Sequence, residues 1–186
     1  MGELDYFWEM MATTGRHSKL IGKLVASINR YESVDNGEIE VFQDGPSIAY
    51  DGEKHVKDSD LKLIDLATIS DLNEFRKEIP VYESFIPDFM YFKKGNFVFD
   101  YSESRFAGYP ELIVEVWSKG NSKIERILKK HIYSTSPITE HWYIEQDSNI
   151  VECWLGQVRL PDKNLTEILI DHNGYEFDLR HLAIKN

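Results

Sequence analysis

The chain has 186 residues, of which 42% are hydrophobic, and its 21 Lys and Arg against 32 Asp and Glu give a formal net charge of −11. A chain of this length buries a core without disulfides or a structural metal, and its single cysteine, Cys153, excludes an internal disulfide. It has no apolar run that could span a membrane and no basic opening typical of a secretory signal. We therefore expect one cytoplasmic domain over residues 1–186, with no membrane partner and no extensive basic surface.

Apolar residues at helical spacing define the first element. Leu20, Leu24 and Ile28 recur every four residues, which predicts an amphipathic helix. Period-two alternation on both sides of Asp44-Gly45-Pro46 predicts a β-hairpin next. The expected elements of this half are a helix over residues 16–31, a hairpin of strands 38–41 and 47–50, an exposed loop over 51–60, a strand over 61–66 and a short helix over 70–79.

The second half is dominated by strands around one helix. Ser122 and Glu125 have the spacing of a capping box, in which each side chain satisfies a free amide at a helix start. The expected elements are strands 85–92, 96–101 and 111–117, a helix over 122–134, and strands 141–145, 150–155, 157–160 and 165–170. This order favours an α/β (α+β) fold, with a mixed central sheet flanked by helices.

Two carboxylates interrupt predicted strands whose other residues are mostly apolar, which is the pattern of a buried strand. Asp88 lies in an aromatic strand, and Glu115 lies in the apolar run of residues 112–117. A buried carboxylate is costly unless it is paired or binds a cation. If the two strands are neighbours, the two acids converge and can hold magnesium, with open positions for water and a substrate phosphate. Alternatively, Asp88 forms a turn or cap and Glu115 pairs with a lysine.

Several blocks of the chain resemble the Uma-two family of bacterial proteins. These blocks are Arg16-His17-Ser18, Ile86-Pro87-Asp88-Phe89, Pro110 to Ser118, Glu125 to Tyr133 and Pro137 to Trp142. Their order and spacing together carry the resemblance, which spans about residues 13–155. The chain departs from the family pattern at Glu111 and Glu125, where Asp is usual, at Pro137 for Gly and at His141 for Tyr.

The resemblance implies a fold and a set of site residues. It implies a restriction-endonuclease-like core of the PD-(D/E)XK type, here with extra C-terminal antiparallel strands. It makes Asp88 and Glu115 ligands of Mg²⁺, or of Mn²⁺ as a substitute, with the backbone carbonyl of Val116 as a further ligand. The superfamily lysine would fall at Trp117, so its role is expected on the following helix, at Lys129. Lys119 is the competitor.

The remaining candidates each have a structural alternative. Lys129 could instead form a surface ion pair with Glu125, one helical turn away. His17 is either an acid–base group or a packing and hydrogen-bonding residue. Glu9 and Glu111 could each add a carboxylate to the site or be purely structural.

The leading functional hypothesis is a Mg²⁺-dependent nuclease that hydrolyses DNA with a metal-activated water. The charge of −11 opposes DNA binding, although a local cluster could provide attraction; its members are Lys119, Lys123, Arg126, Lys129 and Lys130. The alternative is a catalytically inactive module of the same fold that binds protein or nucleic acid. Aromatic residues of the C-terminal strands, namely Trp142, Tyr143, Trp154 and Tyr175, raise the further prospect of a homodimer.

Overall fold

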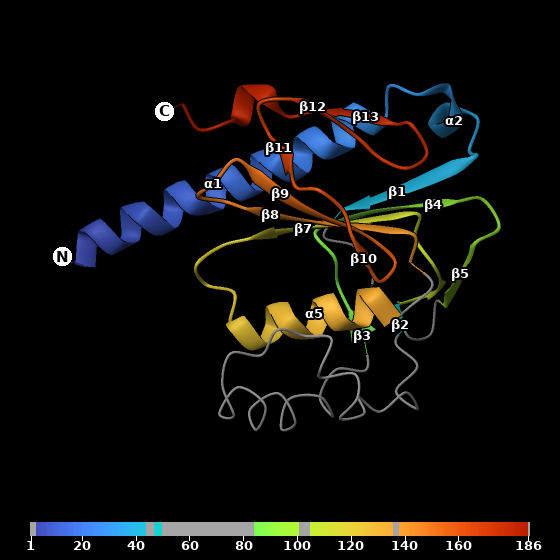
Figure 1. Ribbon diagram of the computed structural model, residues 1–186, viewed down its shortest axis with the longest axis horizontal. Coiled ribbons are helices and arrows are strands. Elements are labelled where there is room, and N and C mark those ends of the chain that lie inside the picture. The colour runs from blue at the N-terminus through green and yellow to red at the C-terminus, as the bar shows by residue number, and fades with distance from the viewer. Residues whose placement is uncertain (1–2, 44–46, 50–83, 101–104, 136–137, 186) are drawn as a thin grey trace.

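The computed structural model describes residues 3–43, 47–49, 84–100, 105–135 and 138–185 (Figure 1). Its centre is a seven-stranded mixed sheet in the order β1-β4-β7-β8-β9-β10, with β11 also paired to β9. The strands are β1 (Ile39–Gln43), β4 (Phe89–Lys93), β7 (Leu112–Trp117), β8 (Glu140–Glu145), β9 (Ile150–Leu155), β10 (Val158–Arg159) and β11 (Lys163–Asn164). The expected α/β class with a mixed sheet is confirmed.

Strands β7 and β8 form the parallel pair at the centre of this sheet, and the other pairings within it are antiparallel. All six residues of β7 are buried, as are the first five of β8. A strand covered on both faces must be apolar almost throughout, which explains the Leu-Ile-Val run of β7. Glu115 therefore stands out as the charged residue within that strand.

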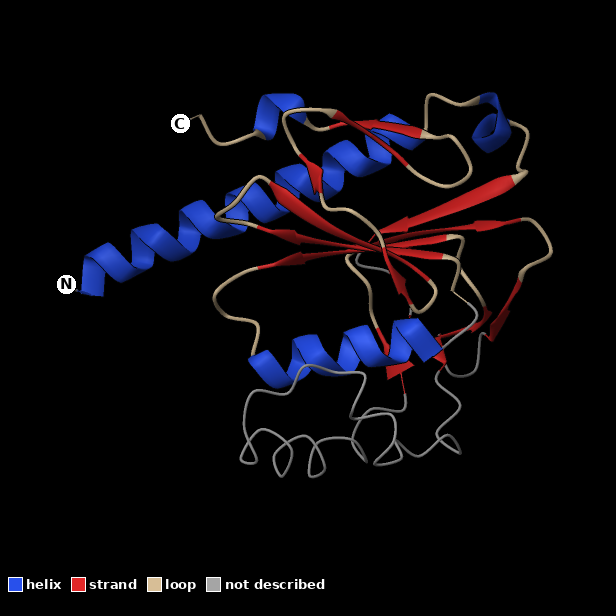
Figure 2. Ribbon diagram, viewed as in Figure 1, coloured by secondary structure: helices blue, strands red, loops and turns tan. Residues whose placement is uncertain are grey.

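Helices cover both faces of the sheet (Figure 2). Helix α1 (Glu3–Ile28) lies across one face, together with the hairpin of β12 (Ile168–Ile170) and β13 (Glu176–Asp178) and the short 3-10 helix η2 (Arg180–Leu182). Helix α5 (Lys123–Thr135) covers the opposite face. A short helix, α2 (Glu32–Asp35), precedes β1. Each face encloses its own apolar cluster, so the sheet separates two cores.

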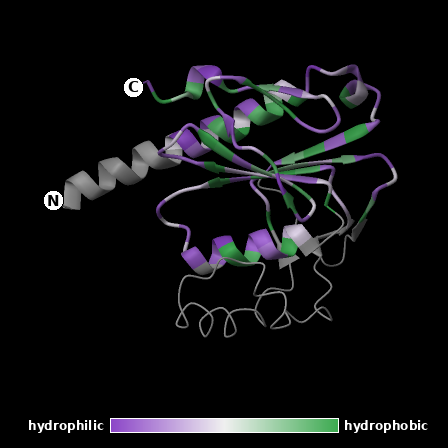
Figure 3. Cartoon of the chain, viewed as in Figure 1, coloured by the Kyte–Doolittle hydropathy of each residue, from purple (hydrophilic) through white to green (hydrophobic). Residues whose placement is uncertain are grey.

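Side chains of β7 alternate between these two cores. Leu112, Val114 and Val116 join the core beneath α1, whereas Ile113 and Trp117 join the one beneath α5. Cys153 is buried in the first core, as expected, and burial raises the pKa of its thiol to about 12. Figure 3 shows hydrophobic colour concentrated on the central strands and mixed colour along α5, as expected for an amphipathic helix.

A second, four-stranded sheet has the order β3-β2-β6-β5. Its strands are β2 (Ser47–Ala49), β3 (Ser84–Phe85), β5 (Phe97–Asp100) and β6 (Arg105–Gly108). Gly108 is required here, because a Cβ at this residue would lie 2.3 Å from the carbonyl oxygen of Asn96 and its φ is +148°. The sequence analysis did not predict β6.

The hairpin predicted from residues 38–41 and 47–50 is wrong. Strand β1 pairs with β4 in the central sheet, whereas β2 pairs with β3 and β6 in the second sheet. The strand expected over 85–92 is likewise divided between β3 and β4. Pro87 lies at the break, where it cannot donate a ladder hydrogen bond.

The helices also differ in their limits from the prediction. Helix α1 begins at Glu3 rather than residue 16 and ends at Ile28 rather than 31, so His17 lies within the helix and not at its start. Helix α5 agrees closely, and Ser122 Oγ accepts a hydrogen bond from the Glu125 amide at 3.1 Å. The loop, strand and helix predicted over 51–60, 61–66 and 70–79 lie outside the described residues. In the part of the chain that the structure describes, no helix has the length and apolar character needed to cross a membrane.

Candidate functional site

Glu115 occupies the middle of β7, on the face covered by α5. Its side chain is 1% exposed, so it lies in the core rather than at the surface. Because Ile113 and Trp117 lie on the same face of the strand, strand alternation turns Glu115 toward α5. A charged group in this position needs partners, and α5 supplies them.

Two residues of α5 hold the two carboxylate oxygens of Glu115. Lys129 places its ammonium 2.7 Å from Oε2, and Tyr133 donates its hydroxyl to Oε1 at 2.6 Å. Both residues are largely buried, with 11% of the Lys129 side chain exposed and 1% of Tyr133. Lys129 lies farther from Glu125, at 3.7 Å, so the ion pair with Glu115 dominates over the surface pair considered from the sequence.

Asp88 approaches the same strand from the neighbouring edge. It directly precedes β4, whose pairing with β7 ends at Phe89 and Val114. Beyond that point the amide of Val116 donates to Oδ2 of Asp88 at 2.7 Å. Oδ1 of Asp88 lies 3.3 Å from Nε2 of His17 on α1. Asp88 therefore satisfies a strand amide and contacts a helix from the opposite layer.

The electrostatics of this group are dominated by burial. Removal from water raises the pKa of Glu115 to about 7, with a further rise from the charge of Asp88 and an opposing effect from Lys129. Although burial alone would lower the pKa of Lys129, Glu115 raises it above its usual value. Burial, followed by the charge of Glu115, raises the pKa of Tyr133 well above its usual value, so its hydroxyl stays protonated and donates.

The donor set of this site fits a hard divalent cation. Asp88 lies at the edge of β7 that faces β4, where it accepts from the Val116 amide, and its charge acts on Glu115. The carbonyl of Val116 points to the same edge as its amide, because both backbone groups of a strand residue face one neighbour. No group of three or more His, Cys, Asp or Glu side chains in the described residues is arranged to hold a metal. A cation here would therefore rely on Asp88, Glu115, the carbonyl of Val116, and water or phosphate, as Mg²⁺ often does.

The structure gives no role at this site to Lys119, and the side chain of Glu9 cannot be assigned to it. Lys119 is exposed in the turn that follows β7, whereas it is Lys129 that contacts Glu115. Glu9 belongs to α1, but its side chain lies outside the described residues.

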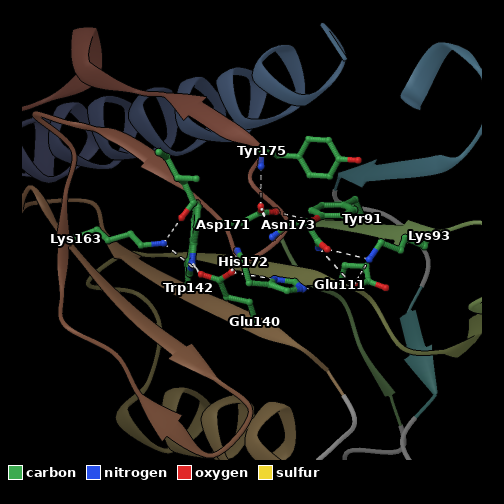
Figure 4. A network of polar contacts seen from close by, with 11 residues as sticks. Tyr91, Lys93, Glu111, Glu140, Trp142, Lys163, Asp171, His172, Asn173 and Tyr175 are labelled. Atoms are coloured by element: carbon green, nitrogen blue, oxygen red, sulfur yellow. Dashed lines mark hydrogen bonds and ion pairs between the residues drawn. The ribbon is translucent and has the colours of Figure 1, made fainter. Parts of the chain in front are cut away.

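Glu111 belongs to a different group of contacts from Glu115. It precedes β7, which begins at Leu112, and it contacts Lys93 and Asn96 at the other end of the strand. Its carboxylate therefore belongs to a different network, drawn in Figure 4.

This second network connects the C-terminal hairpin to the sheet (Figure 4). Glu140 on β8 is 1% exposed and accepts hydrogen bonds from the indole of Trp142 at 2.5 Å and the amide of His172 at 2.6 Å. The imidazole of His172 lies between two carboxylates, 3.1 Å from Glu140 and 3.5 Å from Glu111. Lys163 adds a contact of 3.3 Å to Glu140. Each of these carboxylates has polar partners among the described residues, and together they connect the C-terminal hairpin to the sheet.

Three members of the basic cluster expected on and before α5 pair with acids of the same chain. Lys129 pairs with Glu115, Arg126 lies 2.5 Å from Glu145, and Lys130 lies 2.7 Å from Glu152. Arg126 and Lys130 also lie over the ring of Trp117. These internal pairs reduce the positive potential that the cluster can present to nucleic acid.

Tyr133 is the site residue that the sequence analysis missed. The available signal was its position four residues after Lys129, which places both on one row of α5. From the sequence, a role at the site was expected only for Lys129 and not for Tyr133. A hydroxyl donor to a buried carboxylate becomes evident only when β7 and α5 are seen packed together.

A protein-family model matches residues 5–180, nearly the whole chain. The chain belongs to the Uma2 family. That family is described as "Putative restriction endonuclease", in agreement with the resemblance drawn from the motifs. None of the functionally curated proteins compared with the Uma2 chain matches it.

A solved structure supports the fold assignment. The crystal structure of a "putative nuclease belonging to DUF820" from Anabaena variabilis ATCC 29413 superposes with a TM-score of 0.60. The match covers 91% of the present chain and 82% of the other, at 13% sequence identity. At that identity the likeness establishes the restriction-endonuclease-like fold of this Uma2 protein and leaves its activity to be argued from the site.

Proposed function

We propose that this Uma2 protein is a Mg²⁺-dependent nuclease that cleaves phosphodiester bonds in DNA. The observation that carries the proposal is that Asp88 is close enough for its charge to act on Glu115, whose carboxylate in turn pairs with Lys129 at 2.7 Å. Two acids and a lysine are the groups needed to hold a cation and to stabilise charge at a phosphate. The family description supports the same reaction class.

Each residue has a distinct proposed role. Asp88 and Glu115 bind the cation through carboxylate oxygens, with the carbonyl of Val116 as a third protein ligand. Bound Mg²⁺ supplies Lewis-acid polarisation of the phosphate and a lower pKa for a coordinated water. Lys129 orients the attacking water or offsets negative charge that develops on the phosphate. His17 holds Asp88 in place through their 3.3 Å contact.

The test combines metal binding with DNA cleavage. Calorimetric titration with Mg²⁺ and Mn²⁺, and nicking of supercoiled plasmid in the same buffers, are measured for the native chain, Asp88→Asn and Glu115→Gln. We expect both activities in the native chain and neither in the two variants. Glu152→Gln is the matched control, because Glu152 is a partly buried acid in a 2.7 Å ion pair outside the site. A native chain that neither binds metal nor nicks DNA would refute the proposal.

The second candidate is a module without catalytic activity. It is favoured by the pairing of the site within the chain, since Lys129 neutralises Glu115 and His17 contacts Asp88. Such pairs stabilise a buried carboxylate with no need for a metal. This candidate predicts no divalent-ion binding in the calorimetric experiment, and it predicts DNA or protein binding that Glu115→Gln leaves intact.

A further inference from the structure

The two oxygens of Glu115 are held by chemically different groups. Oε2 faces the ammonium of Lys129 at 2.7 Å, whereas Oε1 accepts the hydroxyl of Tyr133 at 2.6 Å. The two donors lie four residues apart on α5, one turn of the same helix. A single helix face therefore fixes both oxygens of one carboxylate on the facing strand.

These two donors respond differently to an arriving cation. An ammonium and Mg²⁺ repel each other, so both cannot remain on Oε2 at close range. A neutral hydroxyl on Oε1 has no such conflict, and a carboxylate can bind a cation through one oxygen while the other accepts a hydrogen bond. A cation bound at Oε2 would therefore compete with Lys129 for that oxygen, and it would leave the contact between Oε1 and Tyr133 in place.

The hydroxyl of Tyr133 is also held rigidly. Its ring is 1% exposed and packs in the core beneath α5 with Met90, Ile113 and Tyr143. A buried ring in a close-packed core has few alternative rotamers. The position of the hydroxyl is therefore fixed by the packing of the ring. Its hydrogen bond to Oε1 of Glu115 does not depend on where Lys129 lies.

We propose that Tyr133 is a positioning residue of the metal site, which holds Oε1 of Glu115 so that Oε2 is presented to the cation when Lys129 withdraws. The inference rests on the proposed function, because it assigns a role within the same site. Tyr133 touches neither substrate nor cation and acts through Glu115.

The test uses Tyr133→Phe, which keeps the buried ring and removes only the hydroxyl. Tyr143→Phe is the matched control, since Tyr143 is 2% exposed in the same core and its hydroxyl contacts His141, whereas Glu115 acts on it through its charge. Three quantities are measured for the full-length proteins: Mn²⁺ affinity by calorimetry, kcat and KM for DNA cleavage, and the unfolding midpoint without metal. We expect Tyr133→Phe to weaken Mn²⁺ binding roughly 10- to 100-fold and lower kcat with little change in KM. Tyr143→Phe should retain the native Mn²⁺ affinity, kcat and KM, and only its unfolding midpoint should change.

The possible outcomes separate the two proposals. A purely structural role would lower the unfolding midpoint in both variants and leave Mn²⁺ affinity unchanged in both. Native Mn²⁺ affinity in a folded Tyr133→Phe protein would therefore overturn the role of Tyr133 while the nuclease proposal stands. Absence of Mn²⁺ binding by the unaltered protein would instead overturn the proposed function, and the role of Tyr133 with it.

Discussion

Lys129 and Lys130 are adjacent on α5 and each forms a 2.7 Å ion pair, yet they face different acids. Lys129 meets Glu115, which is 1% exposed, whereas Lys130 meets Glu152, which is 21% exposed. Helical geometry turns consecutive residues by about 100°, so neighbours in sequence reach different parts of the sheet. The pair offers a comparison of the same side chain inside and outside the site.

Replacement of Lys129 by methionine should separate metal binding from catalysis. Removal of the ammonium relieves its competition with the cation at Glu115, so we expect Mn²⁺ affinity to rise by about tenfold, the equivalent of about 1.4 kcal/mol. DNA cleavage should fall by about 100-fold or more, since the charge that stabilises the phosphate is lost. Calorimetry and single-turnover cleavage measure the two effects.

Lys130→Met provides the control, because it breaks an equivalent ion pair outside the site and should leave both quantities close to native. Weaker metal binding in Lys129→Met would indicate that the lysine holds the acid in place rather than competing with the cation.

The free energy of unfolding of the metal-free protein should fall as pH rises, because Glu115 holds its proton to a higher pH in the folded state than in the unfolded state. Burial raises its pKa from 4.5 to about 7 on folding, so between these values the folded state retains a proton that the unfolded state has lost. The stabilisation is full below pH 4.5 and is lost as pH increases through 7, with a total of about 3 kcal/mol. Urea denaturation in EDTA at pH 5, 6, 7 and 8 measures this slope.

The variant Glu115→Gln cannot titrate at this position, so its unfolding free energy should fall less between pH 5 and 8 than that of the native chain. Equal slopes for the two proteins would show that Glu115 keeps an ordinary pKa in the folded state.

At the residue scale, the sequence identified the acids but not their partner hydroxyl. Asp88 and Glu115 could be predicted because a charged residue in an apolar strand is conspicuous in any sequence. Tyr133 could not, because a tyrosine on the apolar stripe of a helix is ordinary until its hydroxyl is seen 2.6 Å from Glu115. The same reasoning applies to His172, whose two carboxylate neighbours, Glu111 and Glu140, are remote from it in the sequence.

At the element scale, the hairpin of β12 and β13 depends on a buried acid of the central sheet. Glu140 accepts hydrogen bonds from the amide and the imidazole of His172, and these contacts fix the segment between the two strands. Glu140→Gln keeps the shape of the side chain but removes its charge. We expect a loss of roughly 1–3 kcal/mol in unfolding free energy and faster amide exchange over residues 168–178.

The control for this prediction is Glu176→Gln. Glu176 lies on the same hairpin, but its ion pair with Arg30 is exposed at 48% and 47% of the two side chains, so its removal should change stability by less than about 0.5 kcal/mol. Faster exchange spread evenly over the whole protein in Glu140→Gln would contradict a local role in holding the hairpin.

Some elements could be predicted from their own residues, whereas others depended on residues far away in the sequence. Helix α5 was predicted closely because its signals are local: a capping serine, an apolar stripe and a proline soon after its end. Strand β1 was recognised as a strand but given the wrong partner. Which strand pairs with β1 depends on β4, some fifty residues away, and no short-range pattern encodes that choice.

At the scale of the whole molecule, the charge of −11 should produce weak and only mildly salt-dependent DNA binding. Arg126, Lys129 and Lys130, three members of the basic cluster that the structure describes, are paired with acids of the chain and are therefore less able to neutralise phosphates. We expect log K against log[salt] to have a slope of about −2 or shallower, since each phosphate contact contributes about −0.9.

Fluorescence anisotropy with a labelled duplex, in Ca²⁺ to prevent cleavage, measures this slope. A slope steeper than about −4 would require a basic surface that the described residues do not present. Lys119→Glu is an informative companion variant, because Lys119 is exposed close to the end of β7.

The aromatic residues that raised the prospect of a homodimer are mostly used within the chain. Trp142 and Tyr143 are 0% and 2% exposed, and Trp154 and Tyr175 pack partly against the two cores. These side chains therefore offer little surface to a second copy. Self-association stays a prediction, for which sedimentation of the native protein is the direct test.

The sequence by itself determined the α/β class, the strand with the buried Glu115, the helix that carries Lys129 and membership in a family described as a putative restriction endonuclease, whereas Asp88 precedes its strand instead of lying within it. These follow from local patterns, namely alternation, helical spacing and motif order, which need no knowledge of distant contacts. Only the tertiary structure decided which strands pair and which contacts separate Glu111 from Glu115. It alone also showed that Lys129 and Tyr133 each donate a hydrogen bond to the carboxylate of Glu115. Such features arise from contacts between segments remote in the chain, such as β1 with β4 and α5 with β7, which no local pattern of residues specifies.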